Sequence, residues 1–324
     1  MKILVTGSAG FIGFHTASRL LEDGHEVVGL DNFNDYYSVE LKRCRDKILR
    51  QKTGFTGIEC DLSDFLKIKN LFQKNRFEIV CHLAAQVGVR YSLINPFIYQ
   101  KSNNEGFLNI LEAGRRAGSR RLVYASSSSV YGGNRKLPFS ETDPVDNPVS
   151  LYAATKKFNE LAACAYGHLH GVQTIGLRFF TVYGPWGRPD MAVWLFTEAM
   201  LQGKTIKVFN HGNMRRDFSY IDDVVNGIYA ALFTDGLPQN DVFNLGNHRS
   251  EKLMDLIRII ADCLGKEPKM ELLPIQPGDV LDTYADIDKA RKALNFSPKT
   301  NLAEGIPKFV EWYREYHKTE TRSQ

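Results

Sequence analysis

The chain has 324 residues, with 41 lysines and arginines against 37 aspartates and glutamates, and its formal net charge is +4. This charge is small for the length and no basic run appears, so we expect no nucleic acid partner. A chain of this size buries about three quarters of the surface that its unfolded form exposes, and it therefore needs no disulfide or metal to stay folded.

The cysteines and histidines argue against a disulfide framework and a metal site. The five cysteines are odd in number and too scattered for a metal clip, so we expect reduced thiols in a cytoplasmic protein. The eight histidines show no HExxH or similar ligand spacing, so we expect no metal. No stretch approaches the roughly 18 apolar residues of a membrane span. We therefore expect a soluble protein with no membrane partner.

The elements predicted up to about residue 180 alternate between strand and helix, which predicts an α/β fold with a Rossmann-like, doubly wound parallel sheet. The strands are expected at 1–6, 26–30, 57–60, 78–83, 121–126 and 172–179, and the helices at 11–22, 64–74, 95–117 and 152–169. The polar segment 32–56 is expected to be a solvated helix or loop with no other role.

Past about residue 180 the alternation weakens. Helices are expected at 192–202, 222–233, 253–264 and 302–317, and short strands at 206–209 and 241–245. We expect residues 1–180 to form the doubly wound domain and residues 181–324 to form a smaller, partly discontinuous C-terminal lobe. Segments near 210–250 are expected to return to the first domain.

A glycine motif joins the first predicted strand to the first predicted helix. Gly7, Gly10 and Gly13 allow a tight turn and let the backbone approach a pyrophosphate at the helix N-terminus. Asp31 ends the next strand, 18 residues after Gly13. Its carboxylate can accept hydrogen bonds from an adenosine ribose and would repel a 2′-phosphate. The pattern predicts NAD rather than NADP, the alternative being that Asp31 caps a helix or a turn.

Tyr152 and Lys156 lie four residues apart in a predicted helix and therefore share one face. A nearby ammonium stabilises a phenolate and lowers the pKa of the tyrosine. Such a phenolate can take the proton of an alcohol while a hydride leaves its carbon. Four serines, residues 126–129, follow the fifth strand, where open α/β sheets bind ligands, and Ser127 can hydrogen-bond the reacting oxygen. The alternatives are a solvated lysine and an ordinary serine loop.

These motifs resemble a known family over nearly the whole chain. The GxxGxxG glycines, SSSSVYG, YAATK and RRDFSYIDD resemble the extended short-chain dehydrogenase/reductase family of nucleotide-sugar enzymes. Within it, the segments LAAQVGVRYSLINP (83–96), VSLYAATKKFNEL (149–161) and LRFFTVYGPWGRPDMA (177–192) are most similar to UDP-glucuronate 4-epimerases. The resemblance implies an NAD-binding Rossmann domain and a lobe that binds a UDP-sugar.

The resemblance also implies roles for individual residues. Tyr152 is expected to be the acid/base, Lys156 its partner and Ser127 a hydrogen-bond donor to the substrate oxygen. The positions that match NAD contacts are Gly7, Gly10, Phe11, Ile12, Gly13, Asp31, Asn32, Asp61, Leu62, Ala84, Ala85, Tyr152 and Lys156. Asp61 could equally be the N-cap of a helix.

The implied substrate contacts lie farther along the chain. They are Arg90, Ser128, Ser129, Thr181, Arg188, Arg216 and Asp279. Ser128, Ser129 and Thr181 are expected near the sugar carboxylate, which the Arg188 cation could balance. Arg216 and Asp279 are expected at the nucleotide diphosphate and its ribose. A structural ion pair is the alternative for Arg90 and for Arg188.

The expected reaction is the 4-epimerisation of UDP-glucuronate to UDP-galacturonate through a 4-keto intermediate. The alternatives are a 4-epimerase of a neutral or N-acetylated UDP-hexose, a UDP-glucuronate decarboxylase, and a non-catalytic NAD-sensing protein. Thr181 replaces the asparagine of many galactose-type epimerases, and Ser129 replaces the acidic residue typical of decarboxylases. The resemblance further implies a homodimer formed through helices 95–117 and 152–169, and a role in polysaccharide biosynthesis.

Overall fold

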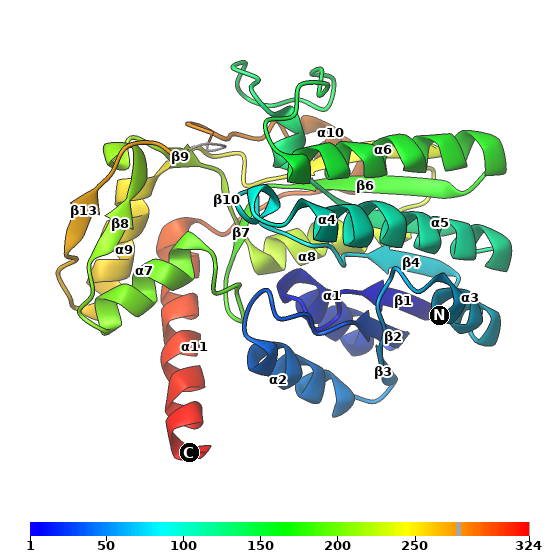
Figure 1. Cartoon of the computed structure of the whole chain (residues 1–324), viewed down its shortest axis with the longest axis horizontal. Helices are drawn as coiled ribbons and strands as arrows, with labels where there is room; N and C mark the ends of the chain where they lie inside the picture. Colours follow the sequence, from blue (N-terminus) through cyan, green and yellow to red (C-terminus); the bar gives the residue numbers. More distant parts are fainter. Residues whose placement is uncertain (277–279, 324) are drawn as a thin grey trace.

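The centre of the molecule is a seven-stranded, fully parallel sheet, seen in a computed structural model that describes residues 1–276 and 280–323 (Figure 1). Its strands are β1 (Lys2–Thr6), β2 (Glu26–Asp31), β3 (Phe55–Glu59), β4 (Ile79–His82), β5 (Arg121–Ser127), β6 (Gln173–Phe179) and β11 (Asn240–Leu245). Their order is β3–β2–β1–β4–β5–β6–β11. The predicted doubly wound sheet is confirmed. Because the order reverses between β1 and β4, a crevice is expected at their carboxyl ends.

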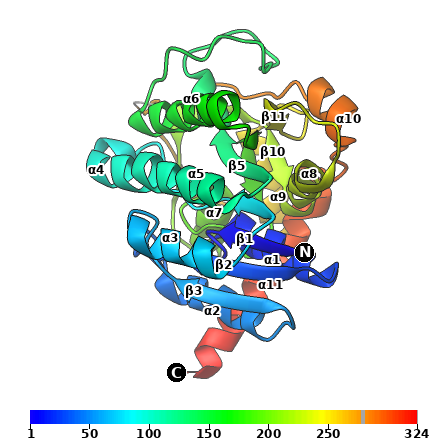
Figure 2. The same cartoon turned by 90° about the vertical axis from the view of Figure 1, so that its right-hand side faces the viewer.

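Helices cover both faces of this sheet (Figure 2). One face carries α1 (Phe11–Glu22), α2 (Val39–Arg50) and α8 (Ile221–Phe233), and the other carries α3 (Phe65–Lys74), α5 (Gly106–Ala117) and α6 (Leu151–His170). Side chains alternate between faces along a strand. In β1, Ile3 and Val5 join the core under α1, whereas Leu4 joins the core under α3 and α5. The short strands are therefore apolar throughout, as the sequence shows.

The helix expected at 95–117 is interrupted. It consists of α4 (Pro96–Tyr99), a π-helical segment η2 (Gln100–Glu105) and α5. Asn103, in the π-helical segment, is buried. Its carbonyl accepts a hydrogen bond from Asn159 Nδ2 at 2.7 Å, while its side chain pairs with both backbone groups of Gln86. Such bulges often occur at functional sites, and this one anchors the loop that follows β4.

The segment 32–56 differs from its expected role as a solvated helix or loop, and that prediction is wrong. Helix α2 buries Leu41, Lys42, Arg45 and Leu49, which recur at helical spacing and form one face. The polar composition of the segment predicts a solvated position, but Lys42 and Arg45 are buried. Both cations hydrogen-bond to loops beside the sheet, and these contacts allow their burial.

The C-terminal part adds helices and three small two-stranded sheets. The helices are α7 (Ala192–Leu201), α9 (Leu253–Leu264), α10 (Asp288–Leu294) and α11 (Leu302–Ser323). The sheets pair β7 (Thr181–Tyr183) with β10 (Phe218–Tyr220), β8 (Ile206–Val208) with β13 (Met270–Leu272), and β9 (Arg215–Arg216) with β12 (Glu251–Lys252). Most of these strands were not predicted, because two or three residues show no alternation. None of the described helices has the length and apolar character that crossing a lipid bilayer requires.

Candidate active site

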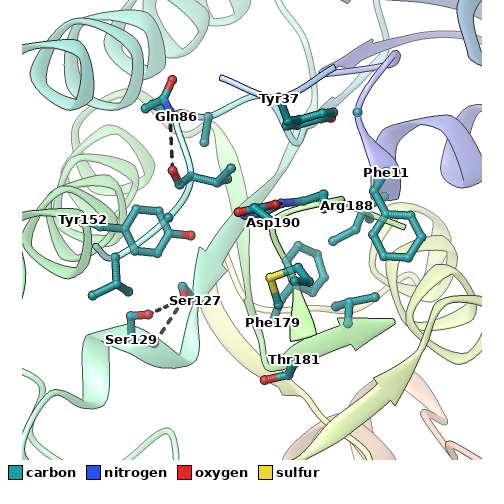
Figure 3. A pocket seen from close by; sticks show the side chains of 18 of the residues that line it. Phe11, Tyr37, Gln86, Ser127, Ser129, Tyr152, Phe179, Thr181, Arg188 and Asp190 are labelled. Atoms are coloured by element: carbon teal, nitrogen blue, oxygen red, sulfur yellow. Dashed lines mark hydrogen bonds and ion pairs between the residues drawn. The ribbon is translucent and has the colours of Figure 1, made fainter. Parts of the chain in front are cut away.

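A cavity of about 860 Å³ lies at the carboxyl ends of the central strands (Figure 3). The predicted site residues that line it are Gly7, Gly10, Phe11, Ile12, Gly13, Asp31, Asn32, Asp61, Leu62, Ala84, Ala85, Arg90, Ser127, Ser128, Ser129, Tyr152, Lys156, Thr181, Arg188 and Arg216. Asp279 lies outside the described residues. The fold thus brings together side chains from both halves of the chain.

The glycine turn between β1 and α1 forms one wall of the cavity. Gly7 has a φ of +71°, and a Cβ atom there would lie 2.8 Å from the backbone nitrogen of Ala84. A Cβ atom on Gly13 would lie 2.0 Å from the carbonyl oxygen of Gly7. Among the described residues, no side chain caps α1 at Gly10, and its first turn has no acidic residue. Free amide groups at such a helix start fit the pyrophosphate of a dinucleotide.

Two acidic side chains continue this wall. Asp31 accepts hydrogen bonds from the N–H groups of Ala9 at 3.1 Å and Phe33 at 2.9 Å, so it stabilises a turn as well as lining the cavity. Burial raises its pKa, and these hydrogen bonds and the charges of Lys42 and Arg45 oppose that rise.

Asp61 does not cap a helix, so that alternative is wrong. It accepts hydrogen bonds from Asn32 Nδ2 at 3.0 Å and from the N–H of Ser63 at 2.9 Å. The N-cap of α3 is Asp64, which accepts a hydrogen bond from the N–H of Lys67 at 3.1 Å.

Tyr152 and Lys156 approach the cavity from α6, but their pKa values differ from the expectation. Burial raises the pKa of Tyr152, while a hydrogen bond with Ser127 and the charge of Arg188 lower it. Lys156 Nζ donates a hydrogen bond to the carbonyl of Ala125 at 2.8 Å, and it has no resolved effect on the tyrosine. Burial lowers the pKa of Lys156 to about 8. In this structure Ser127 and Arg188 therefore favour the phenolate.

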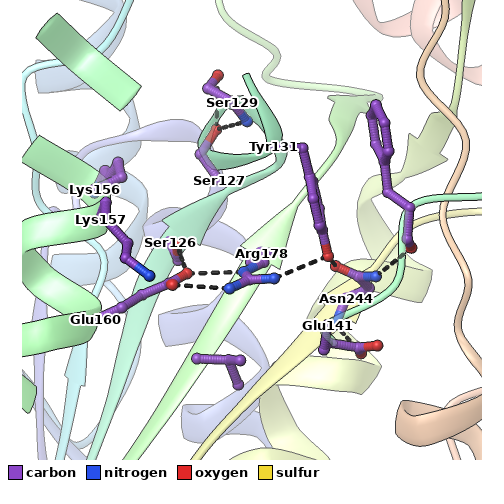
Figure 4. Close-up of polar contacts among 12 residues, drawn as sticks. Ser126, Ser127, Ser129, Tyr131, Glu141, Lys156, Lys157, Glu160, Arg178 and Asn244 are labelled. Carbon is purple, nitrogen blue, oxygen red and sulfur yellow. Dashed lines mark hydrogen bonds and ion pairs between the residues drawn. The ribbon is translucent and has the colours of Figure 1, made fainter. Parts of the chain in front are cut away.

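A buried polar network lies behind the lysine (Figure 4). Glu160 and Arg178 form a bidentate ion pair with N–O distances of 2.8 and 2.9 Å. Ser126 Oγ donates a hydrogen bond to Glu160 at 2.6 Å. Arg178 also donates to the Tyr131 hydroxyl at 3.0 Å, which donates to Asn244 Oδ1 at 2.6 Å. The network ties α6 to β5, β6 and β11. Glu160 also opposes the fall of the Lys156 pKa that burial causes.

Hydroxyl groups gather on the side of the cavity next to Tyr152. Ser127 Oγ accepts the N–H of Ser129 and donates to its hydroxyl, both at 3.1 Å. Thr181 begins β7, and its N–H donates to the carbonyl of Asp217 at 3.1 Å. The carboxyl ends of β5 and β6 therefore place the serine and threonine hydroxyls around one space (Figure 3).

Arg188 faces Tyr152 across the cavity and pairs with Asp190. Its Nε and Nη2 atoms donate to the two carboxylate oxygens at 3.0 and 2.5 Å, and the Tyr36 hydroxyl donates to the same carboxylate at 3.1 Å. The pair raises the pKa of Arg188 despite the opposing effect of burial. Arg188 therefore makes the ion pair that was its alternative role, and it also lines the cavity.

The other two predicted arginines, Arg90 and Arg216, also line the cavity. The Arg90 side chain is exposed, and its guanidinium lies 4.9 Å from the centre of the Phe209 ring. Arg216 donates hydrogen bonds to the carbonyls of Arg215 at 2.8 Å and Leu281 at 3.1 Å. These contacts orient the Arg216 guanidinium at the cavity wall.

Sequence reasoning missed several polar residues of the cavity, among them Tyr36, Lys42, Gln86 and Asp190. Lys42 Nζ donates to Asn34 Oδ1 at 2.8 Å, and burial lowers its pKa to about 8. The only signal in the sequence was the helical spacing of residues 41, 45 and 49, which predicts a buried face of α2.

Comparisons with known proteins agree with this geometry. The chain matches the model of the NAD dependent epimerase/dehydratase family over residues 3–246. It is 47% identical to UDP-glucuronate 4-epimerase 2 of Arabidopsis thaliana, over 98% of this chain and 77% of the plant protein. It is 42% identical to the probable UDP-glucuronate 4-epimerase of Rhizobium meliloti strain 1021, over 97% of each.

Among solved structures, the chain is similar to UDP-glucuronic acid 4-epimerase from Bacillus cereus in complex with UDP-glucuronic acid and NAD. The TM-score is 0.93 and the sequence identity 34%, over 98% of this chain and 100% of the other.

Proposed function

Because the chain belongs to the NAD-dependent epimerase/dehydratase family, we propose that it interconverts UDP-glucuronate and UDP-galacturonate by epimerisation at C4. One observation carries the proposal. A single cavity places Tyr152 and Ser127 opposite the Arg188 cation, beside the glycine turn. A hydroxyl acid/base and a cation within one space suit a sugar that carries both a reacting alcohol and a carboxylate.

The residues of the chain divide the chemistry as follows. Bound NAD supplies the group that takes a hydride from C4 and returns it, so none is consumed. Tyr152 removes the proton from the O4 hydroxyl, and Ser127 hydrogen-bonds the same oxygen. The 4-keto sugar then turns to present its other face, and Tyr152 gives the proton back. Lys156, held by the Ala125 carbonyl, lies one helical turn away, where it can reach the nicotinamide ribose.

The carboxylate needs restraint during this step. A 4-keto uronic acid is a β-keto acid and tends to lose carbon dioxide. We infer that the hydroxyls of Ser128, Ser129 and Thr181, all on the cavity wall, hold the carboxylate in an orientation that disfavours this loss. Arg188, which also pairs with Asp190, faces the carboxylate, and Arg216 on the cavity wall is assigned to the diphosphate.

The first experiment incubates the purified protein with UDP-glucuronate, without added NAD, and separates the sugar nucleotides. We expect UDP-galacturonate, with NAD carried through purification. If added NAD is required, the reaction stands and tight retention of the cofactor fails. Formation of UDP-xylose would contradict the carboxylate restraint. Turnover of UDP-glucose or UDP-N-acetylglucosamine, but not of UDP-glucuronate, would contradict the assignment of the substrate.

We also propose a homodimer in which α4, α5 and α6 of two copies pack together. The proposal is supported by large apolar side chains that these helices expose, including Phe97 at 82% and Leu161 at 58%. Light scattering should give twice the mass of one chain, and Phe97→Asp should give a monomer. Leu272→Asp, which changes an exposed leucine of β13, is the matched control. A monomeric unmodified protein would contradict the proposal.

We place the enzyme in the cytoplasm, with polysaccharide biosynthesis as the use of its product. All five cysteines are free, and Cys164 is exposed, a state that suits a reducing compartment. The link to polysaccharides rests on the family resemblance. Fractionation of cells that produce the protein, followed by detection in the cytoplasmic fraction, tests the compartment.

A further inference from the structure

Arg45 of α2 joins two loops that belong to opposite walls of the cavity. Its side chain is completely buried. Nη1 donates to the carbonyl of Ala9, within the glycine turn, at 2.9 Å. Nη2 donates to the carbonyls of Trp186 at 2.6 Å and Gly187 at 3.1 Å, in the loop that follows β7. One planar guanidinium therefore fixes the spacing between two backbone segments.

The loop that Arg45 holds needs support from other contacts, since Trp186 has a φ of +59°. That backbone region is strained for a non-glycine residue and persists only where surrounding contacts impose it. The contacts here come from outside the loop. His15 Nε2 donates to the Pro185 carbonyl at 2.9 Å, and the Trp186 ring packs against Phe14 and Trp312.

The same loop carries the charged groups of the substrate side. Arg188 follows Gly187 directly, and its ion pair with Asp190 lies on the cavity wall. The charge of Arg188 lowers the pKa of Tyr152, against the larger rise that burial causes. A displacement of the carbonyls at 186 and 187 would therefore move the cation that faces the acid/base.

The Nη1 atom of Arg45 contacts the cofactor wall through the carbonyl of Ala9, which lies next to Gly10. Ala9 donates its N–H to Asp31 at 3.1 Å while its carbonyl accepts from Arg45. The peptide groups that flank Ala9 are thus held on one side by the predicted ribose-binding carboxylate and on the other by the arginine. Arg45 touches backbone carbonyls and the Tyr37 hydroxyl, so its action on the reaction runs through the loops it holds.

We propose that Arg45 is a positioning residue that sets the place of Arg188, and hence of the substrate carboxylate, relative to the dinucleotide-binding turn. The inference rests on the proposed function for the identity of the substrate. It assigns to α2 a part in substrate recognition. Arg45 acts there through the uncharged backbone carbonyls of Trp186 and Gly187.

A double-mutant cycle tests the proposal. The variants are Arg45→Met, Arg188→Met and the double variant, with Lys47→Met as a control that removes an exposed cation from the same helix. Because a small misplacement of a binding group can cost about 100-fold, we expect Arg45→Met to lower kcat/KM for UDP-glucuronate by up to that factor. The double variant should be no worse than Arg188→Met alone, since both changes remove one function. The control should match the unmodified protein.

Separate readouts distinguish positioning from folding. Each variant is checked for its melting temperature and for NAD released on denaturation. If the effects of Arg45→Met and Arg188→Met multiply in the double variant, Arg45 acts independently of Arg188 and the proposal is overturned. If Arg45→Met does not fold, Arg45→Lys, which keeps the charge but not the fork, replaces it in the cycle.

Failure of the proposed function would show differently. In that case the unmodified protein itself does not turn over UDP-glucuronate, and the same cycle is run on the dissociation constant of UDP-glucuronate by calorimetry. Coupled losses of affinity would support the positioning role. Independent losses, or an unchanged affinity in Arg45→Met, would overturn it.

Discussion

The two walls of the cavity are built in different ways. The cofactor wall is backbone: Gly7, Gly10 and Gly13 lie within seven residues of sequence, and their fit depends on missing Cβ atoms. The substrate wall is made of side chains from separate segments, such as Thr181, Arg188 and Arg216. The first is therefore specified by a short motif, and the second by contacts that only the folded chain provides.

Tyr152 lies between the two walls, and its replacement should lower kcat more than any other change. Tyr152→Phe removes the hydroxyl that moves the O4 proton, and loss of such an acid/base costs about 10²- to 10⁴-fold in kcat. We expect the NAD content and the melting temperature to stay unchanged. Tyr166→Phe, on the same helix and with a hydrogen bond to Glu112 at 3.3 Å, is the control. A variant with near-normal kcat would remove Tyr152 from the mechanism.

The network behind Lys156 ties α6 to β5, β6 and β11, and breaking it should cost stability. Glu160→Gln leaves the Arg178 guanidinium buried without its carboxylate, and breaking such a pair costs about 3–5 kcal/mol. The double variant Glu160→Gln with Arg178→Met removes both charges and should recover part of that loss. Urea denaturation of the unmodified protein, the single variant and the double variant measures their free energies of unfolding. An equal loss in the single and double variants would contradict the ion-pair explanation.

The cofactor wall should be intolerant of a single methyl group. In Gly13→Ala the new Cβ would lie 2.0 Å from the Gly7 carbonyl oxygen, so the turn must shift. We expect the purified variant to lose its NAD and to unfold at a lower temperature. Gly114→Ala, in α5, is the control because its Cβ would meet only side-chain atoms at 3.7 Å or more. Normal NAD content in Gly13→Ala would mean that the turn is more adaptable than its packing implies.

The same contrast explains what the sequence could predict. The strands of the central sheet, most helices, the glycine turn and the placement of Tyr152 and Lys156 on one helix follow from local spacing and periodicity. Burial of Arg45 does not, because two of the carbonyls that accept its hydrogen bonds lie more than a hundred residues away. The π-helical segment at Asn103 likewise depends on Asn159 of another helix. A charged or polar residue is assigned to the surface until its distant partners are known.

The substrate wall should tolerate change better, with effects confined to the charged substrate. Thr181→Val removes one hydroxyl and keeps the shape of the side chain, and a lost hydrogen bond to a charged group is worth about 1.5–3 kcal/mol. We expect kcat/KM for UDP-glucuronate to fall about tenfold or more and some decarboxylated sugar to form. The NAD content should not change. An equal fall with UDP-glucose, measured in parallel, would place Thr181 outside carboxylate recognition.

His15 connects the walls, and its effect should be the smallest at neutral pH and should grow as the pH falls. Burial lowers its pKa from 6.5 to about 4, so the folded chain keeps the imidazole neutral where the unfolded chain binds a proton. Its contribution is complete above pH 6.5 and is lost as the pH falls to about 4. Between pH 6.5 and 4, each unit by which the pH falls lowers the free energy of unfolding by at most about 1.4 kcal/mol through His15. Glutamine does not titrate and can donate to the Pro185 carbonyl. His15→Gln should therefore flatten the dependence of stability on pH between 6.5 and 4, measured by urea denaturation, and parallel curves for the two proteins would mean that His15 is protonated within the folded chain.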